Sequence, residues 1–259
     1  MTSLTKRALS ERLSVWLRAL RGKARGRTMA QQFTIIHEDN VCAIYVDNQA
    51  GSTCLVAFTG IGHGTGGIGV QRPEFVKAGL EGPRIFVLDK TRSWGNALDI
   101  DKICGMIHPY AQGRRLVTLG NSMGGFLAIL FSGPLGATNC LTFSPQWSVD
   151  PAIIPSEDRW LAYRAKIRIF HYPDLSDSFG PSCRYDIVFG DGALELRHAE
   201  RFPADHPNLS LFHVQGADHN VAAALKNAGA LNEAVVASLT GQPLQALLKT
   251  SGFAVKTSN

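Results

Sequence analysis

Ser122 is the residue of this sequence whose surroundings point most directly to chemistry. It lies in residues 120–124 (Gly-Asn-Ser-Met-Gly), between a strand-like run at 115–119 and a helix-like run at 125–130. A glycine-flanked serine in this setting is typical of a nucleophile elbow, a strained strand-to-helix turn that presents the hydroxyl above a sheet. Both glycines are needed because the turn brings backbone segments too close together for Cβ atoms. The pattern therefore predicts a nucleophilic serine and acyl-transfer chemistry.

A serine nucleophile needs a general base, and His219 is the best candidate. It follows the strand-like segment 209–214 and lies just before a predicted helix that begins at residue 221. A histidine late in the chain, behind a strand, completes the order serine, acid, histidine that is expected with this kind of turn. The other seven histidines lack that context, with His63 in a glycine-rich loop as the one exception.

The base in turn needs an acid that holds its tautomer and stabilises its protonated form. The segment 185–189 is strand-like, and the loop after it contains two carboxylates, Asp191 and Glu195. Either of them could orient His219, and the sequence does not separate them. Asp174 and Asp177, in the preceding loop, are weaker alternatives.

The oxyanion of an acyl-transfer reaction needs backbone N–H donors. Met123 follows the serine directly and is expected to supply one of them. The second should come from the glycine-rich loop after the strand-like segment 53–59. In that loop Ile61 directly follows Gly60, the first glycine beyond the strand, so we expect Gly60 and Ile61 to border the substrate.

The elements that must position these residues alternate between strand-like and helix-like segments from about residue 33 onward. This alternation predicts a mostly parallel sheet with helices on both faces. The expected strands are 33–36 and 41–46 as a hairpin, then 53–59, 84–88, 115–119, 140–143, 185–189 and 209–214, and the expected helices are 70–79, 97–111, 124–131 and 221–239.

Together these motifs make the chain resemble the α/β-hydrolase superfamily over most of residues 33–240. The resemblance rests on residues 120–124, the turn at 59–61, the acid loop at 190–195 and the pair Asp218-His219. It implies an α/β-hydrolase fold with an eight-strand-type sheet, and serine-dependent cleavage of an ester, thioester or amide of a small-molecule acyl substrate. Two features depart from the family pattern: the oxyanion loop is not the common His-Gly form, and Ala193 stands where the acid is usual.

Residues 144–182 interrupt the alternation. They contain five prolines together with Trp147, Trp160, Phe170 and Tyr172. Proline blocks long regular elements, and aromatic side chains supply apolar area for a pocket wall. The segment is either a short lid over the serine or an irregular connection that covers a sheet edge.

Two other function classes compete with a serine hydrolase. Thr59, Gly60, Gly64 and Gly66 match the glycine pattern of short-chain dehydrogenases, and Asp89 ends the next strand where a ribose-binding acid would lie. However, no tyrosine has a lysine four residues later, as an NAD(P)-dependent enzyme of that kind requires. The third class is a catalytically inactive hydrolase fold that serves as a binding module.

The amino-acid composition narrows the possible classes of protein. The chain has 259 residues, 45% hydrophobic and 18% charged, which fits one α/β domain at 31–259. No apolar run is as long as a membrane span. The five cysteines are scattered and form no C-x-x-C pair, so a reduced, cytoplasmic protein fits best. We expect no metal, no cofactor and no nucleic-acid partner.

The net charge of +5 arises from the N-terminal segment. Residues 1–30 contain eight basic residues and one acid, and apolar side chains recur there at helical spacing. One interpretation is an amphipathic helix that contacts an anionic membrane or an acidic partner. The other is a helix packed on its own domain.

Overall fold

The computed structural model describes residues 33–62 and 70–258. The chain divides into two compact units, residues 1–34 and residues 35–259, and the helices and strands described below lie in the second, apart from Thr34 at the start of β1. The predicted basic segment 1–30 lies outside the described residues, as does His63.

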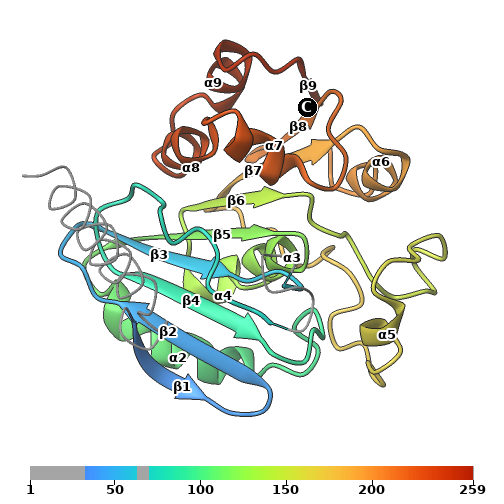
Figure 1. The fold of residues 1–259 in the computed structure, drawn as a ribbon. Helices are drawn as coiled ribbons and strands as arrows, with labels where there is room; N and C mark the ends of the chain where they lie inside the picture. The colour runs from blue at the N-terminus through green and yellow to red at the C-terminus, as the bar shows by residue number, and fades with distance from the viewer. Residues whose placement is uncertain (1–32, 63–69, 259) are drawn as a thin grey trace, which may run out of the picture. The chain divides into compact units, whose positions relative to one another are not determined.

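A nine-stranded sheet forms the centre of the fold, in the order β1-β2-β4-β3-β5-β6-β7-β8-β9 (Figure 1). The six strands from β4 to β8 in this order run parallel to one another, while β2 and β9 are antiparallel to their neighbours β4 and β8. The strands are β1 (Thr34–Glu38), β2 (Cys42–Asp47), β3 (Thr53–Phe58), β4 (Arg84–Asp89), β5 (Arg115–Asn121), β6 (Asn139–Phe143), β7 (Arg184–Gly190), β8 (Leu209–Val214) and β9 (Val255–Ser258).

Helices follow most of the strands. They are α2 (Ile100–Ala111), α3 (Met123–Leu130), α4 (Ser132–Leu135), α5 (Leu161–Arg164), α6 (Ala193–Ala199), α7 (Val221–Asn227), α8 (Leu231–Leu239) and α9 (Leu244–Thr250). The prediction of a mostly parallel sheet flanked by helices is therefore confirmed.

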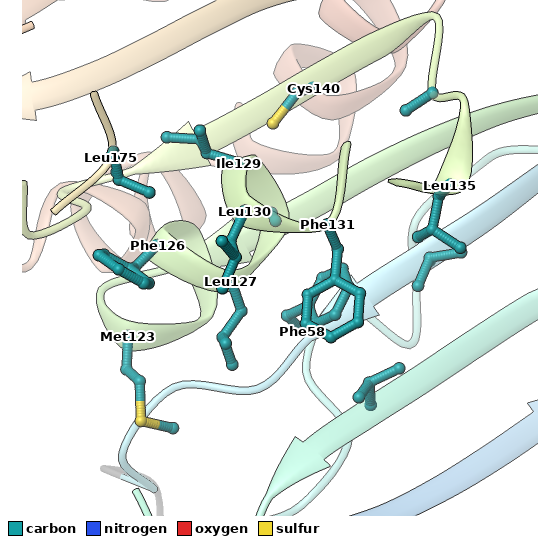
Figure 2. Packing of buried hydrophobic residues seen from close by; sticks show 14 of the residues in the cluster. Phe58, Met123, Phe126, Leu127, Ile129, Leu130, Phe131, Leu135, Cys140 and Leu175 are labelled. Carbon is teal, nitrogen blue, oxygen red and sulfur yellow. The ribbon is translucent and has the colours of Figure 1, made fainter. Parts of the chain in front are cut away.

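The two faces of the sheet carry separate apolar cores because side chains alternate along each strand. On β3, Val56 and Phe58 belong to a core with α2 and α3, whereas Leu55 belongs to a core with α7, α8 and α9. All eight residues of α3 are buried. Figure 2 shows apolar side chains of α3 and of the segment after it close to β3, where the rings of Phe58 and Phe131 lie 4.9 Å apart.

The predicted helix over 70–79 is wrong. Those residues form turns, bends and irregular chain, and Phe75 has a φ of 57°, which a right-handed helix excludes. The ring of Phe75 stacks on Phe143 of β6 at 6.0 Å. Tertiary packing, together with Pro73, therefore overrides the local apolar pattern.

The C-terminal part of the chain is helical where a helical region was predicted over 221–239. It consists of two helices, α7 and α8, separated at Gly229, whose φ is 77°. The helix α6 lies where a loop was expected after β7. This last difference matters because α6 carries Glu195.

The topology marks one edge of the sheet as the place for a ligand. The chain passes from β3 to β4 on one side and then to β5 on the other, so the carboxyl ends of β3 and β5 adjoin a topological switch point. Gly60 follows β3 and Ser122 follows β5. Figure 1 shows α5 beyond the same edge, toward which the arrows of β5 and β6 point.

Within residues 33–62 and 70–258, no helix combines the length and apolar character needed to cross a bilayer. The five cysteines are buried and unpaired, as expected of small apolar side chains.

Candidate active site

Ser122 lies in a strained turn between β5 and α3. Its φ is 55° and its ψ is −122°, a combination that non-glycine residues rarely adopt. A Cβ at position 120 would lie 1.9 Å from the carbonyl oxygen of Gly124, and a Cβ at position 124 would lie 2.2 Å from that of Phe58. Both glycines are therefore required by close backbone contact, as predicted from the sequence.

The structure brings Ser122, His219 and Glu195 into one hydrogen-bonded chain. Nε2 of His219 lies 2.8 Å from Oγ of Ser122, and Nδ1 lies 3.0 Å from Oε1 of Glu195. Ser122 and Glu195 are buried, whereas the imidazole between them is partly exposed. These distances suit proton transfer from a serine hydroxyl to a histidine that a carboxylate orients.

Of the two candidate acids, only Glu195 reaches His219. It lies in the first turn of α6, which directs it back toward the histidine loop. Asp191 is exposed and accepts a hydrogen bond from the backbone N–H of Gly216 at 3.0 Å. Asp174 is occupied locally by the backbone and hydroxyl of Ser176. The geometry therefore favours Glu195 over the other acids.

An arginine from residues 144–182 joins this chain. Nη1 of Arg159 lies 2.6 Å from Oε1 of Glu195 and 2.8 Å from Nδ1 of His219. The same guanidinium pairs with the buried Glu157, with Nη2 to Oε2 at 2.5 Å. Oε2 of Glu157 in turn lies 2.8 Å from Nε2 of the buried His198, whose Nδ1 accepts the backbone N–H of Trp147.

This network alters the acidity of both glutamates. Burial alone raises the pKa of Glu157, but hydrogen bonds from His198 and Arg159 outweigh it and bring the pKa down to about 2. Burial likewise raises the pKa of Glu195, while the hydrogen bond from His219 and the charge of Arg159 bring it below its usual value. Glu195 is therefore held as a carboxylate, the form that an orienting acid requires.

Ser122 has a second polar neighbour. Nε2 of the buried Gln146 donates to Oγ of Ser122 at 3.1 Å, and Oε1 of Gln146 accepts the indole N–H of Trp94 at 3.1 Å. The hydrogen bond from Trp94 thus fixes the orientation of the Gln146 side-chain amide. It leaves Oγ free to donate its proton to His219, because Gln146 donates to the serine rather than accepting from it.

A small cavity of about 120 Å³ adjoins Ser122. It is lined by Gly60, Ile61, Gly62, Glu74, Asn121, Ser122, Trp160, His219, Asn220, Ala222 and Ala223. Met123 is the first residue of α3, and the first N–H groups of a helix have no partner within it. Gly60, Ile61 and Met123 thus lie where the sequence predicted the oxyanion donors, at the ends of β3 and β5.

Glu74 gives this cavity an acidic group that the sequence did not single out. Burial raises its pKa to about 7, although the backbone N–H of Gly60 donates to the carboxylate. At neutral pH the cavity therefore contains a carboxyl group that is protonated in part of the molecules.

The comparisons with known proteins concern the fold. No protein-family model matches the sequence, and no curated protein matches it. The capsule O-acetyltransferase of Neisseria meningitidis serogroup A is similar in structure, with a TM-score of 0.58 and 16% identity over 81% of this chain and 97% of that chain. A histidine-to-alanine variant of that enzyme in complex with CoA gives a TM-score of 0.54 and 15% identity over 80% and 97%. An alpha-beta serine hydrolase homologue from Coxiella burnetii gives 0.52 and 12% identity over 82% and 98%.

The chain has the α/β-hydrolase fold. In an α/β-hydrolase the nucleophile, the acid and the histidine follow one another along the chain and meet at one edge of the sheet. Ser122, Glu195 and His219 follow that order and lie at that edge.

The α/β-hydrolase fold also weakens the dehydrogenase alternative. The parallel strands do not follow the strand order of the dinucleotide-binding fold. Asp89, the candidate ribose ligand, is fully buried and accepts hydrogen bonds from Thr91, Ser93 and Gly95. Its oxygens are thus occupied within the protein. Within the described residues, no three His, Cys, Asp or Glu side chains are arranged to hold a metal ion.

Proposed function

We propose that this α/β-hydrolase-fold protein is a serine-dependent acyl-transfer enzyme that cleaves an ester, thioester or amide through an acyl-enzyme on Ser122. The observation that carries the proposal is the continuous hydrogen-bonded chain Ser122–His219–Glu195, built on an elbow whose backbone is strained. Strain of this kind persists only where the surrounding structure imposes it, and it is concentrated at functional sites. A binding module without activity has no need of it.

The reaction follows from the geometry. Oγ of Ser122 attacks the acyl carbonyl while Nε2 of His219 takes its proton, and Glu195 stabilises the imidazolium that results. The backbone N–H groups of Met123 and Ile61 stabilise the oxyanion. The bond to the leaving group breaks, and His219 returns the proton to that group. Water, or an alcohol, then attacks the acyl-enzyme, with His219 acting again as base.

The size of the cavity indicates the acyl group. A space of about 120 Å³, with Trp160 and Ile61 among its lining residues, suits a short acyl chain such as acetyl. Longer chains would have to displace the lining residues, which costs free energy in a packed protein.

The acceptor of the acyl group defines a second candidate function, O-acetyl transfer to an alcohol. It is supported by the structural similarity to the meningococcal capsule O-acetyltransferase, which extends over 97% of that chain. The first half-reaction is the same in both cases. Only the group that attacks the acyl-enzyme differs.

The test is a series of p-nitrophenyl esters from acetate to octanoate, followed by acid quenching and peptide mass spectrometry. We expect the acetate to turn over fastest and an acetyl adduct on the peptide that contains Ser122. Adding a sugar alcohol separates the two candidates, since transfer yields an acetylated sugar and hydrolysis yields only acetate. Absence of turnover with every ester and thioester, or an adduct on another residue, would overturn the proposal.

A further inference from the structure

A second cavity, of about 550 Å³, is larger than the Ser122 cavity. Its walls come from two segments, residues 90–97 after β4 and residues 163–171 at and beyond α5. Residues 90–97 follow the carboxyl end of β4, which neighbours β3 in the sheet and runs parallel to it. The cavity is therefore built at the same edge of the sheet as Ser122.

The charged side chains that line this cavity are all basic. Its lining includes Lys90, Arg92, Lys166, Arg168 and His171, and no acidic residue is part of it. Of these residues, Lys90 is paired with Glu38 at 3.4 Å, and Asp89, which precedes Lys90, is buried with its own donors. Among residues 33–62 and 70–258, neither Lys166 nor Arg168 forms a salt bridge.

Tyr163 holds two of these cations at the cavity. The guanidinium carbon of Arg92 lies 5.5 Å from the centre of its ring, and Nζ of Lys166 lies 5.3 Å from it. Cations at this distance from an aromatic ring are attracted to it. Their mutual repulsion remains, however, and an anionic ligand with several oxygens would relieve it while accepting charge-assisted hydrogen bonds.

Two contacts connect this basic cavity to the candidate active site. Nε of Arg92 donates to the carbonyl oxygen of Ile61 at 3.4 Å, and Ile61 lines the cavity beside Ser122. Trp160 also lines the Ser122 cavity, whereas Tyr163, one helical turn later, lines the basic one. The N–H of Tyr163 donates to the carbonyl oxygen of Trp160 at 2.8 Å. Residues that line the two cavities are therefore in direct contact with one another.

We propose that the basic cavity lined by Lys90, Arg92, Tyr163, Lys166 and Arg168 binds the phosphate groups of a substrate whose reacting end lies at Ser122. This inference rests on the proposed acyl-transfer function and names the class of substrate, a phosphate-bearing one. The phosphates belong either to the acyl donor, such as a thioester of a phosphorylated carrier, or to the acyl acceptor, such as a sugar phosphate.

The test compares matched substrates that differ in phosphate. Acetyl-CoA and the acetyl thioester of N-acetylcysteamine carry the same reacting group, and only the first carries phosphates. The double variant K166E/R168E reverses two cations that form no described salt bridge. We expect it to raise the KM for acetyl-CoA at least about tenfold more than the KM for the uncharged thioester, because losing even one charge-assisted hydrogen bond lowers the affinity by about that factor. The control K249E/R201E makes the same charge change at exposed positions outside this cavity.

A second experiment tests whether the acyl acceptor carries the phosphate. If the phosphate belongs to the acceptor, acetyl transfer from p-nitrophenyl acetate to glucose 6-phosphate exceeds transfer to glucose, and the K166E/R168E variant loses that preference. The inference is overturned if the wild type prefers the phosphorylated partner in neither arm while it still hydrolyses p-nitrophenyl acetate.

A third arm does not depend on turnover. Calorimetry with ADP as a phosphate probe should show binding that the K166E/R168E variant weakens about tenfold and that the control variant preserves. Absence of turnover with every ester and thioester together with ADP binding would overturn the proposed function but support the site. ADP binding that both double variants reduce equally, or no ADP binding, would count against the cavity.

Discussion

Nη1 of Arg159 lies 2.8 Å from Nδ1 of His219. A guanidinium has only donors, so Arg159 can hydrogen-bond to Nδ1 only when that nitrogen carries no proton. A histidine that is to act as general base toward Ser122 must instead carry the proton on Nδ1 and donate it to Glu195. Arg159 and His219 therefore compete at Nδ1 and also at Oε1 of Glu195, which both approach.

Removing this competition should change the pH dependence of the reaction. In the Arg159→Gln variant the imidazolium of His219 loses a nearby positive charge and keeps Glu195 as its partner. The pKa of Glu195 should rise, because the charge of Arg159 is one of the causes that lower it, and the acidic limb of the kcat/KM profile for p-nitrophenyl acetate should move to higher pH. The variant should also lose about 3 kcal/mol of unfolding free energy, because Glu157 remains buried with one partner fewer.

The control for Arg159 is Arg197→Gln, at an exposed arginine on α6. It removes the same charge without touching Glu195 or His219. An Arg159→Gln profile that coincides with those of the wild type and this control would show that the guanidinium does not act on His219.

Substituting the two acids that the sequence predicted, Glu195 and Asp191, should affect kcat to very different extents. Glu195→Gln keeps the size of the side chain but removes the carboxylate that stabilises the imidazolium, so kcat should fall by about 10²–10⁴-fold. Asp191→Asn should leave kcat within about twofold, since Asp191 is exposed and contacts only a backbone N–H. Steady-state kinetics of both variants decide the matter, and an active Glu195→Gln enzyme would contradict the assignment.

Glu157 should make the protein sensitive to acid. Its pKa is about 2 in the folded state, against 4.5 for an unperturbed glutamate. A lowered folded-state pKa gives stability that is fully present above about pH 4.5 and is lost as the pH falls toward 2. The contribution is about 3 kcal/mol.

Urea unfolding between pH 7 and pH 3 measures that contribution. Glu157→Gln should be less stable than the wild type at pH 7 and should lose less stability on acidification. The control is Glu233→Gln, at an exposed glutamate of α8. Parallel stability curves for the wild type and Glu157→Gln would show that the carboxylate does not bind the buried network as described.

The parts of the site that the sequence predicts are those with a local pattern. Ser122 is marked by its two glycines, and His219 by its position behind a strand. The choice between Asp191 and Glu195 depends on α6, which brings Glu195 back toward the histidine and which the sequence did not predict. The prediction of a helix over 70–79 is wrong for a similar reason, because the packing of Phe75 on Phe143 decides the backbone there.

The remaining members of the site have no local signal. Arg159 and His219 are 60 residues apart, Glu157 and His198 are 41 apart, and Ser122 and Gln146 are 24 apart. Only the folded chain brings each pair together. The one hint in the sequence is the interrupted segment 144–182, which contains Gln146, Glu157, Arg159 and Trp160. Its prolines and aromatic residues indicate either a short lid or an irregular connection, and they give no sign of the polar contacts.

The central claim is that Ser122 is a nucleophile, and labelling with a fluorophosphonate probe tests it most directly. The wild type should be labelled covalently at Ser122, because the probe reacts with serines activated by a neighbouring base. Ser122→Ala should abolish labelling, while Ser176→Ala, at an exposed serine of residues 144–182, should retain it. Circular dichroism should be the same for all three proteins. Labelling that persists in Ser122→Ala, or that is absent from the folded wild type, would contradict the claim.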